Sequence, residues 1–204
     1  MDSVTPSTYD RIADKFAART AEMGPDLLHA AEAFLGRLRP GGRVLDIGCG
    51  PGRDSLCLKS HGAVVIGADL STAMLQLAQS KGLRDLSQMN MLHLGLRARF
   101  FDGVWCNAAL LHLPKETAPR ALVEFQRVLV PGGIFFLAVQ EGTSEGYEPV
   151  SYVDEPLQRF FSRYQGEELK AMLRQTGFDV VEHWTHAPLA RTWLYFLATA
   201  RPEP

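Results

Sequence analysis

Short apolar segments alternate along this chain with stretches of helical periodicity, and this alternation restricts the fold more than any other feature. The segments that we interpret as strands are 43–47, 63–68, 86–90, 101–106, 134–140, 178–186 and 191–200. The stretches with apolar residues at helical spacing include 25–38, 53–61, 115–129 and 166–175. Strands that alternate with helices form parallel βαβ units, and strands that are apolar on both faces need helices on both sides of the sheet. The sequence therefore predicts an α/β protein with a mostly parallel sheet.

Size and composition are those of one globular domain. The chain has 204 residues, of which 46% are hydrophobic and 22% are charged. Such a chain can bury a core without help from disulfides or metals. We therefore expect residues 1–204 to form a single domain.

Charge and cysteine content exclude several classes of protein. The formal net charge of −2 provides no overall positive field for nucleic acid. No apolar run is long enough to cross a membrane, and the first residues lack the basic and apolar regions of a signal peptide. The three cysteines, Cys49, Cys57 and Cys106, are too few for a disulfide framework. The Cys-x-x-Cys and His-Glu-x-x-His patterns are absent, so we expect a cytoplasmic protein without a metal site.

A glycine-rich segment follows the first predicted strand. In the run VLDIGCGPG at 44–52, Gly48, Gly50 and Gly52 let the backbone approach a ligand and adopt conformations closed to other residues. A tight turn between a strand and a helix would by itself explain one or two of these glycines. Asp46 is harder to explain in this way, because a carboxylate inside an apolar strand needs a partner such as backbone N–H groups or a ligand ammonium.

Asp69 ends the second predicted strand, 21 residues after Gly48. An acidic residue at this distance from a glycine loop can accept hydrogen bonds from both hydroxyls of a ribose. The alternative is that Asp69 helps to cap the next helix, for which Ser71 is the predicted N-cap. Its pairing with the glycine loop favours the ribose.

The form of the loop discriminates between nucleotides. A dinucleotide-binding loop has the pattern G-x-G-x-x-G, whereas this loop has the pattern G-x-G-x-G and contains Pro51. Asp46 would repel a pyrophosphate and favour a cationic amine. A ribose together with an amino-acid ammonium describes S-adenosylmethionine better than NAD, so an NAD-dependent oxidoreductase is the disfavoured alternative.

With these features the sequence resembles the class I S-adenosylmethionine-dependent methyltransferases, in the branch of types 11 and 25. The matching segments follow the family's order and extend over nearly the whole chain: YDRIA at 9–13, LDIGCGPG at 45–52, DLSTAML at 69–75, FDGV at 101–104, LHL at 111–113, LVEFQRVLVPGG at 122–133 and ELKAMLRQTGF at 168–178. The resemblance implies a Rossmann-like class I methyltransferase fold. Its seven-stranded, mostly parallel sheet has the order 3-2-1-4-5-7-6, an antiparallel last strand and helices on both faces.

Two further segments receive roles. The resemblance implies that residues 1–40 form helices that cover the cofactor. Residues 141–164 show little periodicity and have the glycines and prolines of a mobile loop, so we interpret them as a substrate lid. From Glu141 to Gln158 there are five acidic residues and no lysine or arginine, which disfavours a polyanionic substrate.

The resemblance also assigns the residues that would hold the cofactor. Asp46 would help to hold the amino group, Asp69 the ribose, and Leu70 and Met74 would flank the adenine. Asn90 stands where the family usually has an aspartate that accepts from the adenine amino group, and its amide oxygen can still accept one such bond. The full set of expected cofactor-binding residues is Tyr9, Asp46, Gly48, Cys49, Gly50, Gly52, Arg53, Asp69, Leu70, Met74, Asn90, Met91, Asn107, Leu111 and His112.

Methyl transfer from a sulfonium is a direct displacement, so a base is needed only when the nucleophile must lose a proton. The best-placed candidate base is His112, which otherwise only lines the site. Further candidates are Glu141, which otherwise caps a helix, and Tyr147, Tyr152 and Tyr164. We expect an S-adenosylmethionine-dependent methyltransferase that acts on an O, N or S nucleophile of a small molecule and releases S-adenosylhomocysteine.

Two alternatives remain within the same fold. One is an RNA or protein methyltransferase, for which the sequence shows no basic cluster, and the other is a non-catalytic protein that binds the cofactor. We expect neither a nucleic-acid nor a membrane partner. The sequence indicates neither the methyl acceptor nor the oligomeric state.

Overall fold

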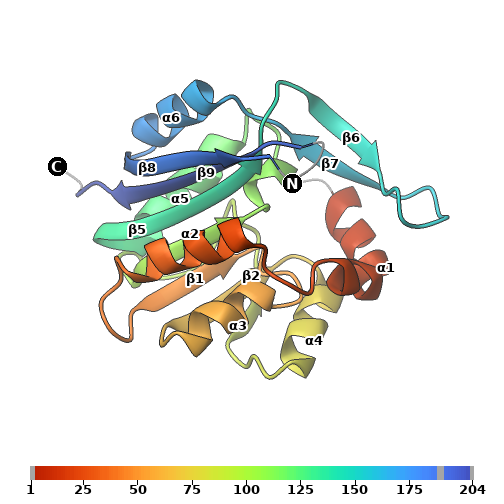
Figure 1. Ribbon diagram of the computed structural model, residues 1–204, viewed down its shortest axis with the longest axis horizontal. Coiled ribbons are helices and arrows are strands. Elements are labelled where there is room, and N and C mark those ends of the chain that lie inside the picture. The colour runs from red at the N-terminus through yellow and green to blue at the C-terminus, as the bar shows by residue number, and fades with distance from the viewer. Residues whose placement is uncertain (1–2, 188–190, 203–204) are drawn as a thin grey trace.

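The computed structural model describes residues 3–187 and 191–202, and its central layer is a seven-stranded sheet of order β3-β2-β1-β4-β5-β9-β8 (Figure 1). The strands of this sheet are β1 (Arg43–Ile47), β2 (Val64–Asp69), β3 (Leu86–Gln88), β4 (Phe101–Asn107), β5 (Leu129–Gln140), β8 (Phe178–His186) and β9 (Trp193–Ala200). β1 to β5 are parallel to one another, whereas β9 runs antiparallel between β5 and β8. The predicted fold is confirmed, with β8 and β9 as the sixth and seventh strands of the expected order.

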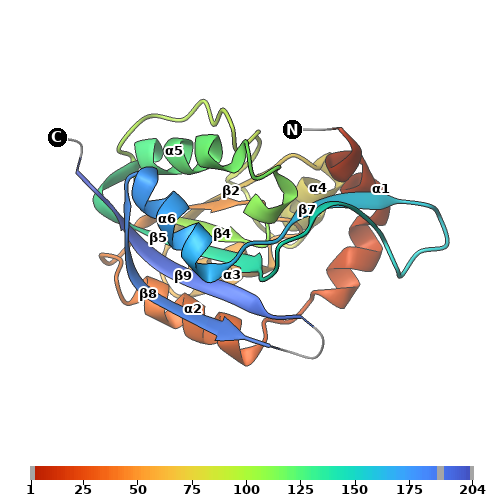
Figure 2. The ribbon, with the colours of Figure 1, turned by 90° about the horizontal axis from the view of Figure 1, so that it is seen from above.

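Helices cover both faces of the sheet because side chains along its central strands point alternately to the two sides. The helices are α1 (Val4–Arg19), α2 (Pro25–Leu35), α3 (Arg53–Ser60), α4 (Thr72–Ser80), α5 (Ala118–Val128), α6 (Gly166–Gln175) and a 3₁₀ turn at Leu110–His112. Phe34 of α2 packs edge-on against Trp105 on one face, and Phe125 of α5 packs against Phe135 on the other. Figure 2 shows α2 and α5 on opposite sides of the sheet.

The segment interpreted as an irregular lid contains a β-hairpin, so the prediction of a loop over 141–164 is wrong. β6 (Glu145–Pro149) and β7 (Gln158–Ser162) form a separate antiparallel ribbon. Tyr147 and Phe160 face each other across it, with ring centroids 5.3 Å apart. Periodicity along the chain does not reveal such a ribbon, because its stabilising pairs join residues that are far apart in sequence.

Helix α1 lies beyond the sheet, at the same end of the molecule as the β6–β7 ribbon (Figure 1). Asp10 on α1 accepts hydrogen bonds from Ser71 Oγ (2.6 Å) and from Ala73 N (3.0 Å) at the start of α4. On its other side, Thr8 Oγ1 donates to the Gln158 carbonyl at 2.7 Å. This helix therefore bridges the region after β2 and the ribbon.

Several boundaries differ from the predicted ones. β5 begins at Leu129, ahead of the predicted strand at 134–140, and β3 is shorter than the predicted strand at 86–90. The 3₁₀ turn before α5 was not predicted. Within the described residues, every helix is too short or too polar to cross a membrane.

Candidate functional site

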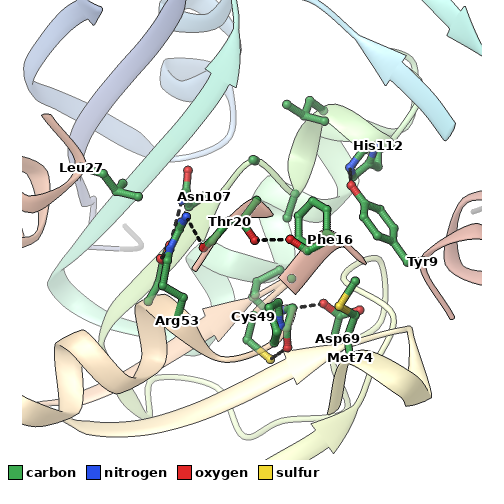
Figure 3. Close-up of a pocket in the computed structure, with 18 of the residues that line it drawn as sticks. Tyr9, Phe16, Thr20, Leu27, Cys49, Arg53, Asp69, Met74, Asn107 and His112 are labelled. Carbon is green, nitrogen blue, oxygen red and sulfur yellow. Dashed lines mark hydrogen bonds and ion pairs between the residues drawn. The ribbon is translucent and has the colours of Figure 1, made fainter. Parts of the chain in front are cut away.

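A cavity of about 540 Å³ opens at the carboxyl ends of the parallel strands. Its inner wall comes from the segments that follow β1, β2 and β4, and its outer wall comes from α1 and β7. Figure 3 shows Tyr9 and His112 facing each other on one side, with Arg53 and Asn107 on the other. The volume suits a small ligand, and this edge of a doubly wound sheet is where ligands usually bind.

The glycine loop after β1 adopts a conformation that favours glycine, with φ of +69° at Gly48 and +53° at Gly50. A side chain at Gly48 would place its Cβ 2.3 Å from the Cβ of Ala109. A side chain at Gly50 would meet no described atom within 4 Å, and this residue lines the cavity. The loop therefore presents backbone directly to whatever occupies the cavity.

Gly52 has a different role from the one expected. It lies outside the residues that line the cavity, and a Cβ there would lie 2.5 Å from Leu83 Cδ1 and 3.0 Å from Ala78 Cβ. Gly52 is the N-cap residue of helix α3 and has a left-handed backbone φ of +81°. Gly52 thus permits close packing of the loop against the end of α4, which is a structural requirement.

Asp69 holds the glycine loop and faces the cavity. Its Oδ2 accepts a hydrogen bond from Gly50 N at 2.8 Å, and its Oδ1 accepts one from Ser71 N at 2.9 Å. Burial raises the pKa of Asp69, and the backbone N–H donors oppose this rise. Ser71 is the observed N-cap of α4, because its Oγ accepts from Met74 N. Asp69 therefore supports the start of α4 while its carboxylate still lines the cavity.

Asp46 does not occupy the position expected of it. Its side chain is 1% exposed, lies outside the cavity lining and accepts a hydrogen bond from Ser55 Oγ of α3 at 2.6 Å. Burial and repulsion by Asp54 raise the pKa of Asp46 to about 8. The partner that this carboxylate needs is thus a hydroxyl of the neighbouring helix.

The carboxylate that lines the cavity beside the glycine loop is Asp54, which sequence reasoning missed. Asp54 accepts hydrogen bonds from Arg53 Nε (2.7 Å), Trp105 Nε1 (3.0 Å) and Asn107 Nδ2 (2.8 Å). Arg53 also donates to the Thr20 carbonyl at 3.2 Å and so ties the segment after α1 to the site. The available signal was an acidic residue in the first turn of the helix that follows the glycine loop.

Tyr9, His112 and Arg159 form a hydrogen-bonded chain along the outer wall. His112 Nδ1 lies 2.7 Å from the Phe160 carbonyl oxygen and must donate to it, because a carbonyl only accepts. With Nδ1 as the donor in the neutral ring, Nε2 accepts from Tyr9 Oη at 2.9 Å. Arg159 Nη1 donates to the same Tyr9 oxygen at 3.2 Å. Burial raises the pKa of Tyr9, and the charge and hydrogen bond of Arg159 oppose the rise.

Most of the predicted site residues meet at the cavity. Those that line it are Tyr9, Gly48, Cys49, Gly50, Arg53, Asp69, Leu70, Met74, Met91, Asn107, Leu111 and His112. Asn90 lies outside the lining, and its Oδ1 accepts from Leu92 N at 2.9 Å, so Met89 and Met91 present the adjacent wall instead. Glu141 is exposed and also lies outside the lining, which removes it as a candidate base.

Further lining residues come from parts of the chain that the sequence did not mark. They include Asp26, Leu27, Arg159, Phe161, Trp193 and Tyr195. Gln140 also lines the cavity, and it is the last residue of the strand predicted at 134–140, at the edge where ligands bind. Arg159 and Phe161 had no comparable signal, since only the β6–β7 pairing brings them to the cavity.

Comparison with known proteins agrees with this geometry. A family model described as a methyltransferase domain matches residues 45–137. The O-methyltransferase rstn1 of Aspergillus nomiae is 31% identical over 156 residues, which are 70% of this chain and 66% of that protein. A ubiquinone biosynthesis O-methyltransferase of Xylella fastidiosa is 28% identical over 240 aligned positions that cover 96% of both chains.

A solved structure shows the same fold. The Burkholderia thailandensis 1,6-didemethyltoxoflavin-N1-methyltransferase, crystallised with 1,6-didemethyltoxoflavin and S-adenosylhomocysteine, has a TM-score of 0.75 at 23% identity. The match covers 97% of this chain and 88% of that one. The strand order, the glycine loop after β1 and the family match all agree with the resemblance found in the sequence, and the chain therefore belongs to the class I S-adenosylmethionine-dependent methyltransferases.

Proposed function

We propose that the protein transfers the methyl group of S-adenosylmethionine to an O, N or S nucleophile of a small molecule and releases S-adenosylhomocysteine. The observation that carries this proposal is the joint presentation of Gly50 and Asp69 to the cavity. The bare backbone of Gly50 leaves space that a Cβ would fill, and the half-buried Asp69 accepts a hydrogen bond from Gly50 N at 2.8 Å, which fixes its carboxylate beside that space. An open backbone cradle next to an oriented carboxylate fits an amino-acid moiety joined to a ribose.

The cofactor would contact three parts of the wall. Gly48, Cys49 and Gly50 would pass under its methionine part, and Asp54 would offer a carboxylate to the ammonium in place of Asp46. Asp69 would accept from the ribose hydroxyls. The remaining contacts that we propose involve Tyr9, Arg53, Leu70, Met74, Met91, Asn107 and Leu111.

His112 is the proposed proton acceptor. When bound, S-adenosylmethionine supplies a methyl group on a sulfonium whose departure leaves a neutral thioether. Alignment of the reactants alone can supply about 7–11 kcal/mol. A protonated nucleophile would pass its proton to Tyr9 Oη while the Tyr9 proton moves to His112 Nε2. The Phe160 carbonyl at Nδ1 would then stabilise the imidazolium.

A small-molecule acceptor is favoured over RNA or protein. Two of the proteins named above carry names that refer to small molecules, namely ubiquinone biosynthesis for the Xylella fastidiosa relative and 1,6-didemethyltoxoflavin for the Burkholderia thailandensis structure. The cavity is walled by α1 and β7, which suits a ligand that is enclosed on several sides.

Thermal unfolding with S-adenosylhomocysteine tests the proposed cofactor. Ligand at about 100 times its dissociation constant should stabilise the fold by about 2.7 kcal/mol. At this chain length we expect the Tm to rise by about 5–10 °C. NAD serves as the control and should leave the Tm unchanged. A shift with NAD, or none with the sulfur ligand, would contradict the proposal, and binding without turnover of any acceptor would favour the non-catalytic alternative.

Asp69→Ala should weaken S-adenosylhomocysteine binding by about 1–3 kcal/mol, because the ribose loses a charged hydrogen-bond acceptor and the glycine loop loses its support. Isothermal titration calorimetry measures the change. Asp85→Ala is the matched control, since Asp85 is exposed and lies outside the cavity lining. An unchanged affinity of the Asp69 variant would remove this residue from the cofactor site.

A further inference from the structure

Arg159 places a positive charge on the outer wall of the cavity. Its guanidinium carbon lies 5.4 Å from the ring centroid of Tyr9, 5.2 Å from that of Phe161 and 5.9 Å from that of Tyr152. These aromatic faces hold the group in a fixed orientation, and the side chain is half-buried. The side chain is therefore a positioned cation that borders the cavity.

The hydrogen-bonding capacity of Arg159 is largely unused. One N–H of the guanidinium goes to Tyr9 Oη, whereas Nε is buried and has no hydrogen-bond partner in the described part of the chain. No carboxylate among residues 3–187 and 191–202 forms an ion pair with it. Glu148, directly opposite Arg159 in the β6–β7 register, pairs with Arg163 instead. A guanidinium carries five donors and is costly to bury without an anion.

The charge of Arg159 helps to lower the pKa of Glu148, but the acidic residues of this segment make their direct contacts with other groups. Glu155 pairs with Arg11, and Glu145 accepts hydrogen bonds from Ser162 Oγ and Lys115 N. The acidic composition of this segment disfavours a polyanionic substrate in the sequence analysis. In the fold, Glu145, Glu148 and Glu155 are engaged in contacts with other residues. The cavity-facing charge of the ribbon is the cation of Arg159.

Gln140 provides a second, independent indication that the cavity binds a polar molecule. Its side chain ends β5, is 4% exposed and lines the cavity. Its Oε1 is buried and has no hydrogen-bond partner within the part of the chain that the structure describes. Buried amide oxygens in native proteins are normally satisfied, so this one is available to a donor on a bound molecule.

We propose that Arg159 binds a carboxylate of the methyl acceptor and that Gln140 accepts a hydrogen bond from a hydroxyl on the same molecule. The neighbouring rings of Phe161, Trp193 and Tyr195 suit a flat aromatic body. The acceptor class is therefore a small aromatic hydroxy acid. This inference rests on the proposed function, because it concerns the acceptor half of the same cavity.

Calorimetric titration of the complex with S-adenosylhomocysteine tests the inference. The probes are 3-hydroxybenzoate and its neutral counterpart 3-hydroxybenzamide, which differ in the charge of one group. A charge-assisted hydrogen bond predicts binding of the benzoate about 10- to 100-fold tighter than the amide. Arg159→Gln should abolish this preference. Arg159→Lys should keep part of it, because the charge remains while the planar donor arrangement is lost.

The matched control is Arg163→Gln, which removes a guanidinium next to β7 but outside the cavity lining. It should retain the full preference for the benzoate. Equal affinity for both probes, failure of the benzoate to bind, or a preference that survives in Arg159→Gln would overturn the inference. Absence of S-adenosylhomocysteine binding by the unmodified protein would instead overturn the proposed function, so the two failures are distinguishable.

Discussion

Gly48→Ala is expected to lower the free energy of unfolding by about 2–5 kcal/mol. Holding a non-glycine residue at φ of +69° costs about 1–2 kcal/mol. The new Cβ would also lie 2.3 Å from the Cβ of Ala109, and overpacking of this kind costs a further ~1–3 kcal/mol. Urea unfolding monitored by fluorescence measures the loss in the absence of any ligand.

Gly50→Ala separates the two causes. Gly50 has a φ of +53°, but a Cβ there would meet no described atom within 4 Å. This variant should lose only the conformational part, about 1–2 kcal/mol. Equal losses at both positions would show that the contact with Ala109 relaxes without cost, against our interpretation of Gly48 as a close-approach glycine.

The protonation of Asp46 should make stability fall as the pH rises. Burial and Asp54 raise the pKa of Asp46 from 3.8 in the unfolded chain to about 8 in the fold. The folded protein therefore holds a proton that the unfolded chain releases above pH 4. The stabilisation is complete below the unfolded pKa and is lost at about 1.4 kcal/mol per pH unit up to about pH 8.

Asp46→Asn removes this titration, and its amide oxygen can still accept from Ser55 Oγ. We expect the variant to match the wild type most closely near pH 5 and to be more stable by about 4 kcal/mol at pH 8. Urea unfolding of both proteins across this interval measures the difference. A stability difference that does not change with pH would contradict a protonated Asp46.

Asp102→Asn provides a control of opposite sign. Partial burial of Asp102 is outweighed by hydrogen bonds from Arg39 and from Arg43 N, which lower the pKa of Asp102 below its usual value. Its stabilisation is present above the unfolded pKa and is lost only as the pH falls through the folded pKa. The control variant should therefore be destabilised equally at pH 5 and pH 8.

The sequence predicts the structure best where the residues that determine an element lie within one segment of the chain. The apolar runs of β1, β2 and β5 and the helical periodicity of α5 and α6 predict their own elements, because burial repeats with the period of the backbone. Gly48 and Gly50 were identifiable because only glycine adopts their φ values without strain. Asp69 was identifiable because parallel strands end at one edge.

Sequence alone determined the α/β class, the family, the glycine loop and the acidic residue at the end of β2, since each of these depends on residues close together in the chain. Tertiary structure decided which carboxylate faces the cavity. Asp46 points to Ser55 of α3, and Asp54 lines the site. Tertiary structure also brings together Tyr9, His112 and Arg159, which come from three elements far apart in sequence. Side-chain direction and contacts between distant segments arise only when the helices pack on the sheet, so no local pattern encodes them.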